Sequence, residues 1–149
     1  MRTELVPYGT AFVLSLAVHY PVYAAPASVI SVKLEDSSAD SSIRNMRMSI
    51  DHDIVNSGLV TFSAVNQSKK LIHEVIVVKE DPRNSLLPYN EKKSQVIESQ
   101  IRHLGEISDL KPGASGKLTL KLKPGTYLLI CNQPGHYKAG MSTPFSVKE

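Results

Sequence analysis

The sequence of 149 residues contains a single cysteine, Cys131, and no tryptophan. One cysteine excludes a disulfide within the chain, and an unpaired thiol in an oxidising compartment is a liability unless it is buried or bound. An immunoglobulin-type sandwich has a buried tryptophan packed against a disulfide between its two sheets, and this sequence can form neither feature. Cys131 therefore requires a specific explanation.

The sequence has no large excess of charge of either sign. It contains 17 Lys and Arg residues and 14 Asp and Glu residues, which gives a formal net charge of +3. The basic residues are scattered and are not interleaved with aromatic residues, so nucleic-acid binding has little support and we expect no such partner. The sequence also lacks a nucleophile with an adjacent base and a pair of catalytic carboxylates. We therefore expect no enzymatic activity.

Long hydrophobic runs are absent as well. The apolar run from Ala11 to Val18 covers eight residues, whereas a membrane-spanning helix needs roughly 20. Arg2 precedes this run and small residues lead to Ala24, a pattern typical of a secretory signal peptide. We predict a signal peptide in residues 1–24, one domain in residues 25–149, no stable membrane insertion, and a periplasmic or secreted location.

Strand patterns dominate the rest of the chain. Residues 59–66 alternate apolar and polar side chains, as in a strand with one buried face. Residues 73–79, HEVIVVK, contain a short continuous apolar run rich in β-branched residues, which is typical of a central strand buried on both faces. Further strands are predicted for residues 29–34, 46–50, 117–122, 126–131 and 143–148. These segments indicate an all-β fold, an antiparallel Greek-key β-sandwich of about seven or eight strands.

Two regions are less regular. Residues 35–45 are rich in serine, and we predict a loop there. Residues 81–103 begin with a polar stretch punctuated by proline, and continue with a segment compatible with a short helix or an extended edge strand. The pattern leaves both alternatives open for this second region.

The segment CNQPGHYKAGM, residues 131–141, follows the last residues of a predicted strand. It places His136 five residues after Cys131, and Met141 five residues after His136. A thiolate, an imidazole and a thioether are ligands that suit copper. Two His, one Cys and a weak axial Met define the blue-copper electron-transfer site. Such a site requires a second histidine.

His73 is the best candidate for the second histidine, because it begins the buried apolar segment 73–79 and can approach the Cys131 strand from elsewhere in the sandwich. His52 and His103 lie in polar contexts that indicate surface positions, and His19 lies within the predicted signal peptide.

With these residues identified, the segments VNQSKKLIHEVIVV and GTYLLICNQPGHYKAGMSTPFSV resemble the cupredoxins, small β-sandwich proteins that hold one type 1 copper ion. The Cys-x4-His-x4-Met spacing looks most like the rusticyanin branch, and the resemblance covers roughly residues 46–149. It implies a one-electron carrier in which His73, Cys131 and His136 bind one copper ion, with Met141 as a long axial ligand.

The sequence departs from the family at Glu74, because many cupredoxins have Asn, Asp or Ser after the first histidine, where the side chain tunes the metal. The resemblance also implies redox partner proteins, such as cytochromes or copper enzymes, that dock near His136 in weak and brief encounters. Lys138 beside it is a candidate for attracting acidic partners, although a single exposed lysine more often only solubilises the surface. We expect a monomer.

Two alternatives remain open from the sequence. The same four ligands would suit a periplasmic protein for copper storage, delivery or resistance, with no electron transfer. Met46 and Met48, with His52 nearby, form a second candidate site for Cu(I), although alternating methionines on a strand more often pack in a core.

Overall fold

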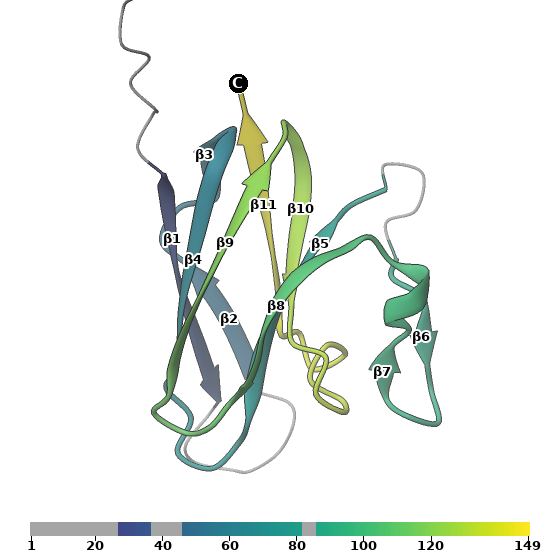
Figure 1. The fold of residues 1–149 in the computed structure, drawn as a ribbon. Coiled ribbons are helices and arrows are strands. Elements are labelled where there is room, and N and C mark those ends of the chain that lie inside the picture. The colour runs from purple at the N-terminus through teal and green to yellow at the C-terminus, as the bar shows by residue number, and fades with distance from the viewer. Residues whose placement is uncertain (1–26, 37–45, 82–85) are drawn as a thin grey trace, which may run out of the picture.

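The computed structural model describes residues 27–36, 46–81 and 86–149 (Figure 1). The predicted signal peptide and most of the serine-rich loop lie outside the described residues. Glu35 and Asp36, placed in that loop by the sequence analysis, belong instead to the end of a strand. In the part of the chain that the structure describes, no helix is long and apolar enough to span a bilayer.

The described residues form a sandwich of two β-sheets, which confirms the predicted all-β fold (Figure 1). The four-stranded sheet has the order β2-β1-β4-β9, and the five-stranded sheet has the order β3-β11-β10-β5-β8. The first sheet contains β1 (Ser28–Asp36), β2 (Met46–Ile50), β4 (Gly58–Asn66) and β9 (Ser115–Leu122). The second contains β3 (Ile54–Asn56), β5 (His73–Lys79), β8 (His103–Leu110), β10 (Gly125–Ile130) and β11 (Ser142–Lys148).

The sheets are mixed and not wholly antiparallel as predicted, because each includes one parallel pair beside its antiparallel pairs. β1 pairs with β4 in parallel, and β11 pairs with β3 in parallel. The chain leaves the first sheet after β2, forms β3 in the second sheet and returns as β4. These crossings between sheets bring segments that are distant in sequence side by side.

The main core lies between the two sheets and is made by the alternating faces that the sequence predicts. On β4, Val60, Phe62 and Ala64 are buried, while the intervening residues are more exposed. Phe62 meets Phe145 of β11 edge to face, with ring centroids 5.5 Å apart. Met46 and Met48 belong to this core as well, which supports the core-packing interpretation of that pair.

The outer face of the second sheet carries a smaller apolar cluster, because β5 and β10 are covered on both sides. Val75 and Val77 of β5 pack into the main core, whereas Ile76 and Val78 pack into the outer cluster with Ile130. The prediction of a central strand at residues 73–79 is therefore confirmed.

The outer cluster is completed by residues 87–101, which we call the strap. It contains a short hairpin of β6 (Tyr89–Asn90) and β7 (Gln95–Val96), followed by one 3-10 turn, η2 (Glu98–Gln100). Figure 1 shows the strap standing to one side of the sandwich, next to the loop that joins β10 and β11. Residues 81–103 thus contain both short strands and a short helical turn, so neither alternative left open by the sequence describes the whole region.

One substantial strand was not predicted. β8 covers residues 103–110, but only Ile107 and Leu110 are buried along it. An edge strand has one neighbour in its sheet and places few side chains in the core, so its hydrophobic alternation is weak.

Candidate metal centre

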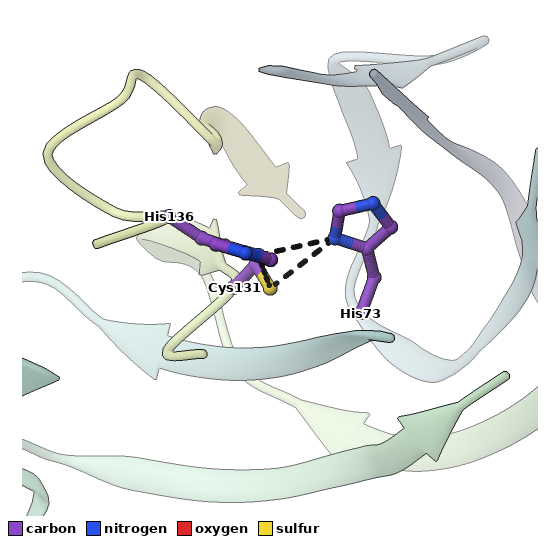
Figure 2. A group of neighbouring side chains, drawn as sticks. All are labelled: His73, Cys131 and His136. Atoms are coloured by element: carbon purple, nitrogen blue, oxygen red, sulfur yellow. Dashed lines mark hydrogen bonds between the residues drawn. The ribbon is translucent and has the colours of Figure 1, made fainter. Parts of the chain in front are cut away.

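Three of the predicted ligands meet at one end of the sandwich (Figure 2). His73 is the first residue of β5, and Cys131 directly follows β10, which is the antiparallel neighbour of β5. His136 lies in the ligand loop (residues 131–141), which connects β10 to β11. Strand pairing therefore brings together side chains that are 58 and 63 residues apart in the sequence.

The donor atoms of these three side chains converge. Cys131 Sγ lies 3.3 Å from His136 Nδ1 and 3.9 Å from His73 Nδ1, and the two Nδ1 atoms are 3.2 Å apart (Figure 2). Nitrogen and thiolate ligands that share one ion at about 2.0 to 2.3 Å lie about 3.3 to 3.8 Å from one another. The observed separations are close to this range, so the group fits a single metal ion.

Burial determines the protonation state of the group. Burial raises the pKa of the Cys131 thiol to about 12. Burial, together with the neighbouring His136, lowers the pKa of His73 to about 4, and burial also lowers the pKa of His136. At neutral pH both imidazoles are therefore uncharged and have a free lone pair, whereas the thiol has to lose a proton before it binds a cation.

The fourth predicted ligand, Met141, immediately precedes β11 and is fully buried. Its backbone carbonyl accepts a hydrogen bond from Cys131 N (3.0 Å), and its backbone N–H donates to the carbonyl of His136 (3.1 Å). These bonds close the ligand loop on itself and hold Met141 beside two of the other predicted ligands. The axial role of Met141 remains a prediction.

The ligand loop owes its tight path to local turns. Gly135 and Gly140 have φ values of 85° and 94°, a region that favours glycine. Ala139 N donates to the carbonyl of Gly135 and Gly140 N donates to the carbonyl of Tyr137, both at 3.0 Å. His136 lies within the first of these turns, and with 7% of its surface exposed it is the most exposed of the four predicted ligands.

Glu74, where the sequence differs from the cupredoxin pattern that it resembles, links the two segments that bear His73 and Cys131. Its backbone N–H donates to Cys131 Sγ at 3.5 Å, and its carboxylate Oε1 accepts from the backbone N–H of Asn132 at 2.9 Å. Burial and the nearby acidic residues Glu98, Glu106 and Asp109 raise the pKa of the Glu74 carboxyl to about 7, against the opposing effect of the Asn132 hydrogen bond.

Two buried features of the centre were missed from the sequence. Asn132, directly after Cys131, is 2% exposed, and its position next to the only cysteine is the one signal that sequence offered. His73 Nε2 is buried and has no hydrogen-bond partner among the described residues.

The carboxylate of Asp36 acts on both histidines and raises their pKa values. Burial lowers these pKa values by more, so the net shift of each histidine is downward.

The remaining described histidines lie away from the centre. His52 is exposed, as predicted. His103 lies at the start of β8 near Glu98 and Glu106, with nitrogen to oxygen distances of 3.8 and 3.5 Å. These three side chains form a second, more exposed group, in which both carboxylates face the same imidazole.

Comparison with solved structures shows that the sandwich has the cupredoxin fold. No protein-family model and no curated protein matches the sequence. Rusticyanin from Thiobacillus ferrooxidans aligns with a TM-score of 0.62 at 16% identity, covering 85% of this chain and 80% of rusticyanin. A structure of rusticyanin is described as that of a copper protein.

Two auracyanins also align with this chain. Auracyanin from the photosynthetic bacterium Roseiflexus castenholzii aligns with a TM-score of 0.55 at 20% identity, over 85% of this chain and 100% of its own. Auracyanin B aligns with a TM-score of 0.57 at 24% identity, over 86% and 94%. At these identities the likeness establishes the fold, and the chemistry has to be argued from the residues of this chain.

Proposed function

We propose that this protein binds one copper ion in a type 1 site and carries single electrons outside the cytoplasm. The proposed ligands are His73, Cys131 and His136, with Met141 in the axial position. The observation that carries the proposal is the convergence of one thiol and two neutral imidazoles, all buried, within 3.2 to 3.9 Å of one another.

The donor set favours copper over zinc. Imidazole and thiolate ligands serve both metals, but a structural zinc site is closed by a fourth nitrogen, sulfur or oxygen donor of ordinary strength. Here the fourth residue held against the group by backbone hydrogen bonds is a methionine, whose thioether is a weak ligand. A trigonal His2Cys set with a weak axial Met is the arrangement in which proteins bind copper for electron transfer.

The chain supplies rigidity around the site. A bound copper ion would gain and lose one electron between Cu(II) and Cu(I). The four proposed ligands are all buried, and the segments that bear them are fixed by strand pairing between β5 and β10 and by hydrogen bonds within the ligand loop. Ligands held in place by their surroundings need to rearrange little when the charge at the centre changes.

The proposed route for the electron runs through His136, because it is the ligand nearest to the solvent. Small or partly exposed loop residues surround it, and they would allow a partner protein to approach closely. They are Pro134, Gly135, Tyr137, Ala139 and Gly140. Lys138 is held by Glu91, with its ammonium 2.5 Å from the carboxylate, so it is less available to acidic partners than the sequence suggested. We propose weak, brief contacts with a redox protein at this surface.

The location and the class of function are also proposals. A buried, metal-bound Cys131 would be protected in an oxidising compartment, which agrees with the signal peptide expected in residues 1–24. The proposed role is that of a carrier and not of an enzyme, since its chemistry is completed by a partner protein. Rusticyanin and the auracyanins support the proposal through their shared fold.

The proposal is tested by the visible absorption of the purified protein after addition of Cu(II). An intense thiolate-to-copper band that disappears on reduction and returns on reoxidation would support a type 1 electron carrier. Tight Cu(I) binding without such a band would indicate copper storage or delivery instead, and no copper binding would refute both functions.

A further inference from the structure

Asn132 is a buried polar residue of the ligand loop. It is 2% exposed, although its side chain is an amide, and it directly follows the proposed ligand Cys131. A buried amide has to satisfy two donors and one acceptor within the protein. The partners that Asn132 uses therefore show what it is built to hold.

Every polar group of Asn132 has a partner, and most of these partners lie in the strap. Its side-chain Oδ1 accepts from Val96 N at 2.6 Å, and its Nδ2 donates to Val96 O at 3.1 Å and to Glu98 Oε1 at 2.8 Å. Its backbone carbonyl accepts from Gln95 Nε2 at 2.9 Å, and its backbone N–H donates to Glu74 at 2.9 Å. The side-chain amide thus pairs with both the N–H and the carbonyl of Val96, as the backbone of a neighbouring strand would.

The strap holds the ligand loop at a second point and is itself anchored. Gly135 N donates to the carbonyl of Ser94 at 2.7 Å, directly before the proposed ligand His136. Val96 is 4% exposed and packs with Ile76 and Ile130 in the outer apolar cluster. The strap is therefore fixed to the sheet by apolar contacts and to the loop by hydrogen bonds.

We propose that Asn132 is a positioning residue through which the strap holds Cys131 Sγ in place. Residue 131 is held on one side by the bond between its backbone and Met141, and on the other side by the hydrogen-bonded amide of the next residue. Release of that amide would free the backbone between Cys131 and His136. The metal-related part of this inference rests on the proposed function, whereas the constraint on Cys131 exists in the protein without metal.

The first test uses the metal-free protein and the rate at which a disulfide reagent modifies Cys131. Substitution Asn132→Ala is expected to accelerate modification by about tenfold, because the loss of even one hydrogen bond of ordinary strength shifts a local opening equilibrium by up to about that factor. The matched control is Tyr127→Phe, which removes a partly buried hydrogen bond to Lys123 O near the opposite end of β10. The control should lose stability without a comparable increase in thiol reactivity.

The second test uses the copper-loaded protein. Asn132→Ala is expected to lower copper affinity by about 10-fold to 100-fold and to change the relative intensities of the thiolate-to-copper bands. Tyr127→Phe should leave both unchanged. A change of stability alone would not alter the band ratio, so this readout separates positioning from a merely structural role.

A third variant weakens the hold on Asn132 without removing the residue, because both bonds to Val96 and the bond to Glu74 remain. The double substitution Gln95→Ala and Glu98→Ala deletes two partners of Asn132 that lie nearer to the solvent, and it covers the case in which Asn132→Ala does not fold. It should accelerate Cys131 modification in the same direction. Modification rates within about twofold of wild type in this variant and in Asn132→Ala would overturn the inference. If wild type binds no copper, the proposed function fails, and the thiol measurement still decides the role of Asn132.

Discussion

Copper binding by Cys131 should depend on pH in a way that follows from the burial of the thiol. Because the pKa of this thiol is raised to about 12, it is protonated at neutral pH and releases one proton when it binds a cation. The association constant for Cu(II) is then expected to rise about tenfold per pH unit, or about 100-fold between about pH 6 and about pH 8, equivalent to about 2.7 kcal/mol.

The two histidines define where this dependence steepens. Burial and His136 hold the pKa of His73 at about 4, so His73 releases no proton on binding at neutral pH. As the pH falls toward 4, protonation of His73 and of His136 competes with the metal as well, and the slope should rise above one proton per ion.

Glu74 would add a second source of protons to this measurement. Burial raises the pKa of its carboxyl to about 7, and a bound cation would favour its ionised form, so Glu74 would also release protons when the metal binds. The affinity is therefore best measured in Glu74→Gln, by competition with a chelator of known affinity at several pH values. Cys131→Ala in the same background is the control and should show no thiol-dependent slope. If the copper affinity of the single variant Glu74→Gln did not change with pH, the assignment of Cys131 as a ligand would be refuted.

Three further predictions concern the proposed ligands and Glu74. Cys131→Ser should abolish the visible copper band while circular dichroism shows an intact β-sandwich; a variant with the full band would contradict the ligand assignment. Met141→Leu should retain copper and raise its reduction potential, measured by voltammetry, because the axial donor that stabilises Cu(II) is lost; an unchanged potential would argue against an axial Met141. In the metal-free protein, the depressed pKa of His73 contributes stability that is present above about pH 6.5 and lost as the pH falls to about 4, roughly 3 kcal/mol in all. The raised pKa of Glu74 acts in the opposite direction, since its contribution is present below about pH 4.5 and lost as the pH rises through about 7. The lowered pKa of His136 acts in the same direction as that of His73. The stability measured by urea denaturation should therefore rise less with pH in wild type than in Glu74→Gln, and equal profiles would refute the opposing contribution of Glu74.

The sequence by itself determined the elements whose signals are local. Residues 59–66 and 117–122 alternate because one face of each strand packs toward the core, and residues 75–78 are continuously apolar because β5 is covered on both faces. The ligand loop was recognisable for the same reason, since Cys131, His136 and Met141 lie within one short segment. Periodicity and spacing depend only on residues that are close together in the chain, so they can be recognised from the sequence alone.

Only the tertiary structure decided which distant residues meet. His73 was selected from its context, but the pairing of β5 with β10 is what places its Nδ1 3.9 Å from Cys131 Sγ. The strap and the role of Asn132 had no sequence signal of comparable strength, because their hydrogen bonds join residues more than 30 positions apart. Such contacts depend on how the sheets cross and which faces they leave to be covered, and these are properties of the whole fold.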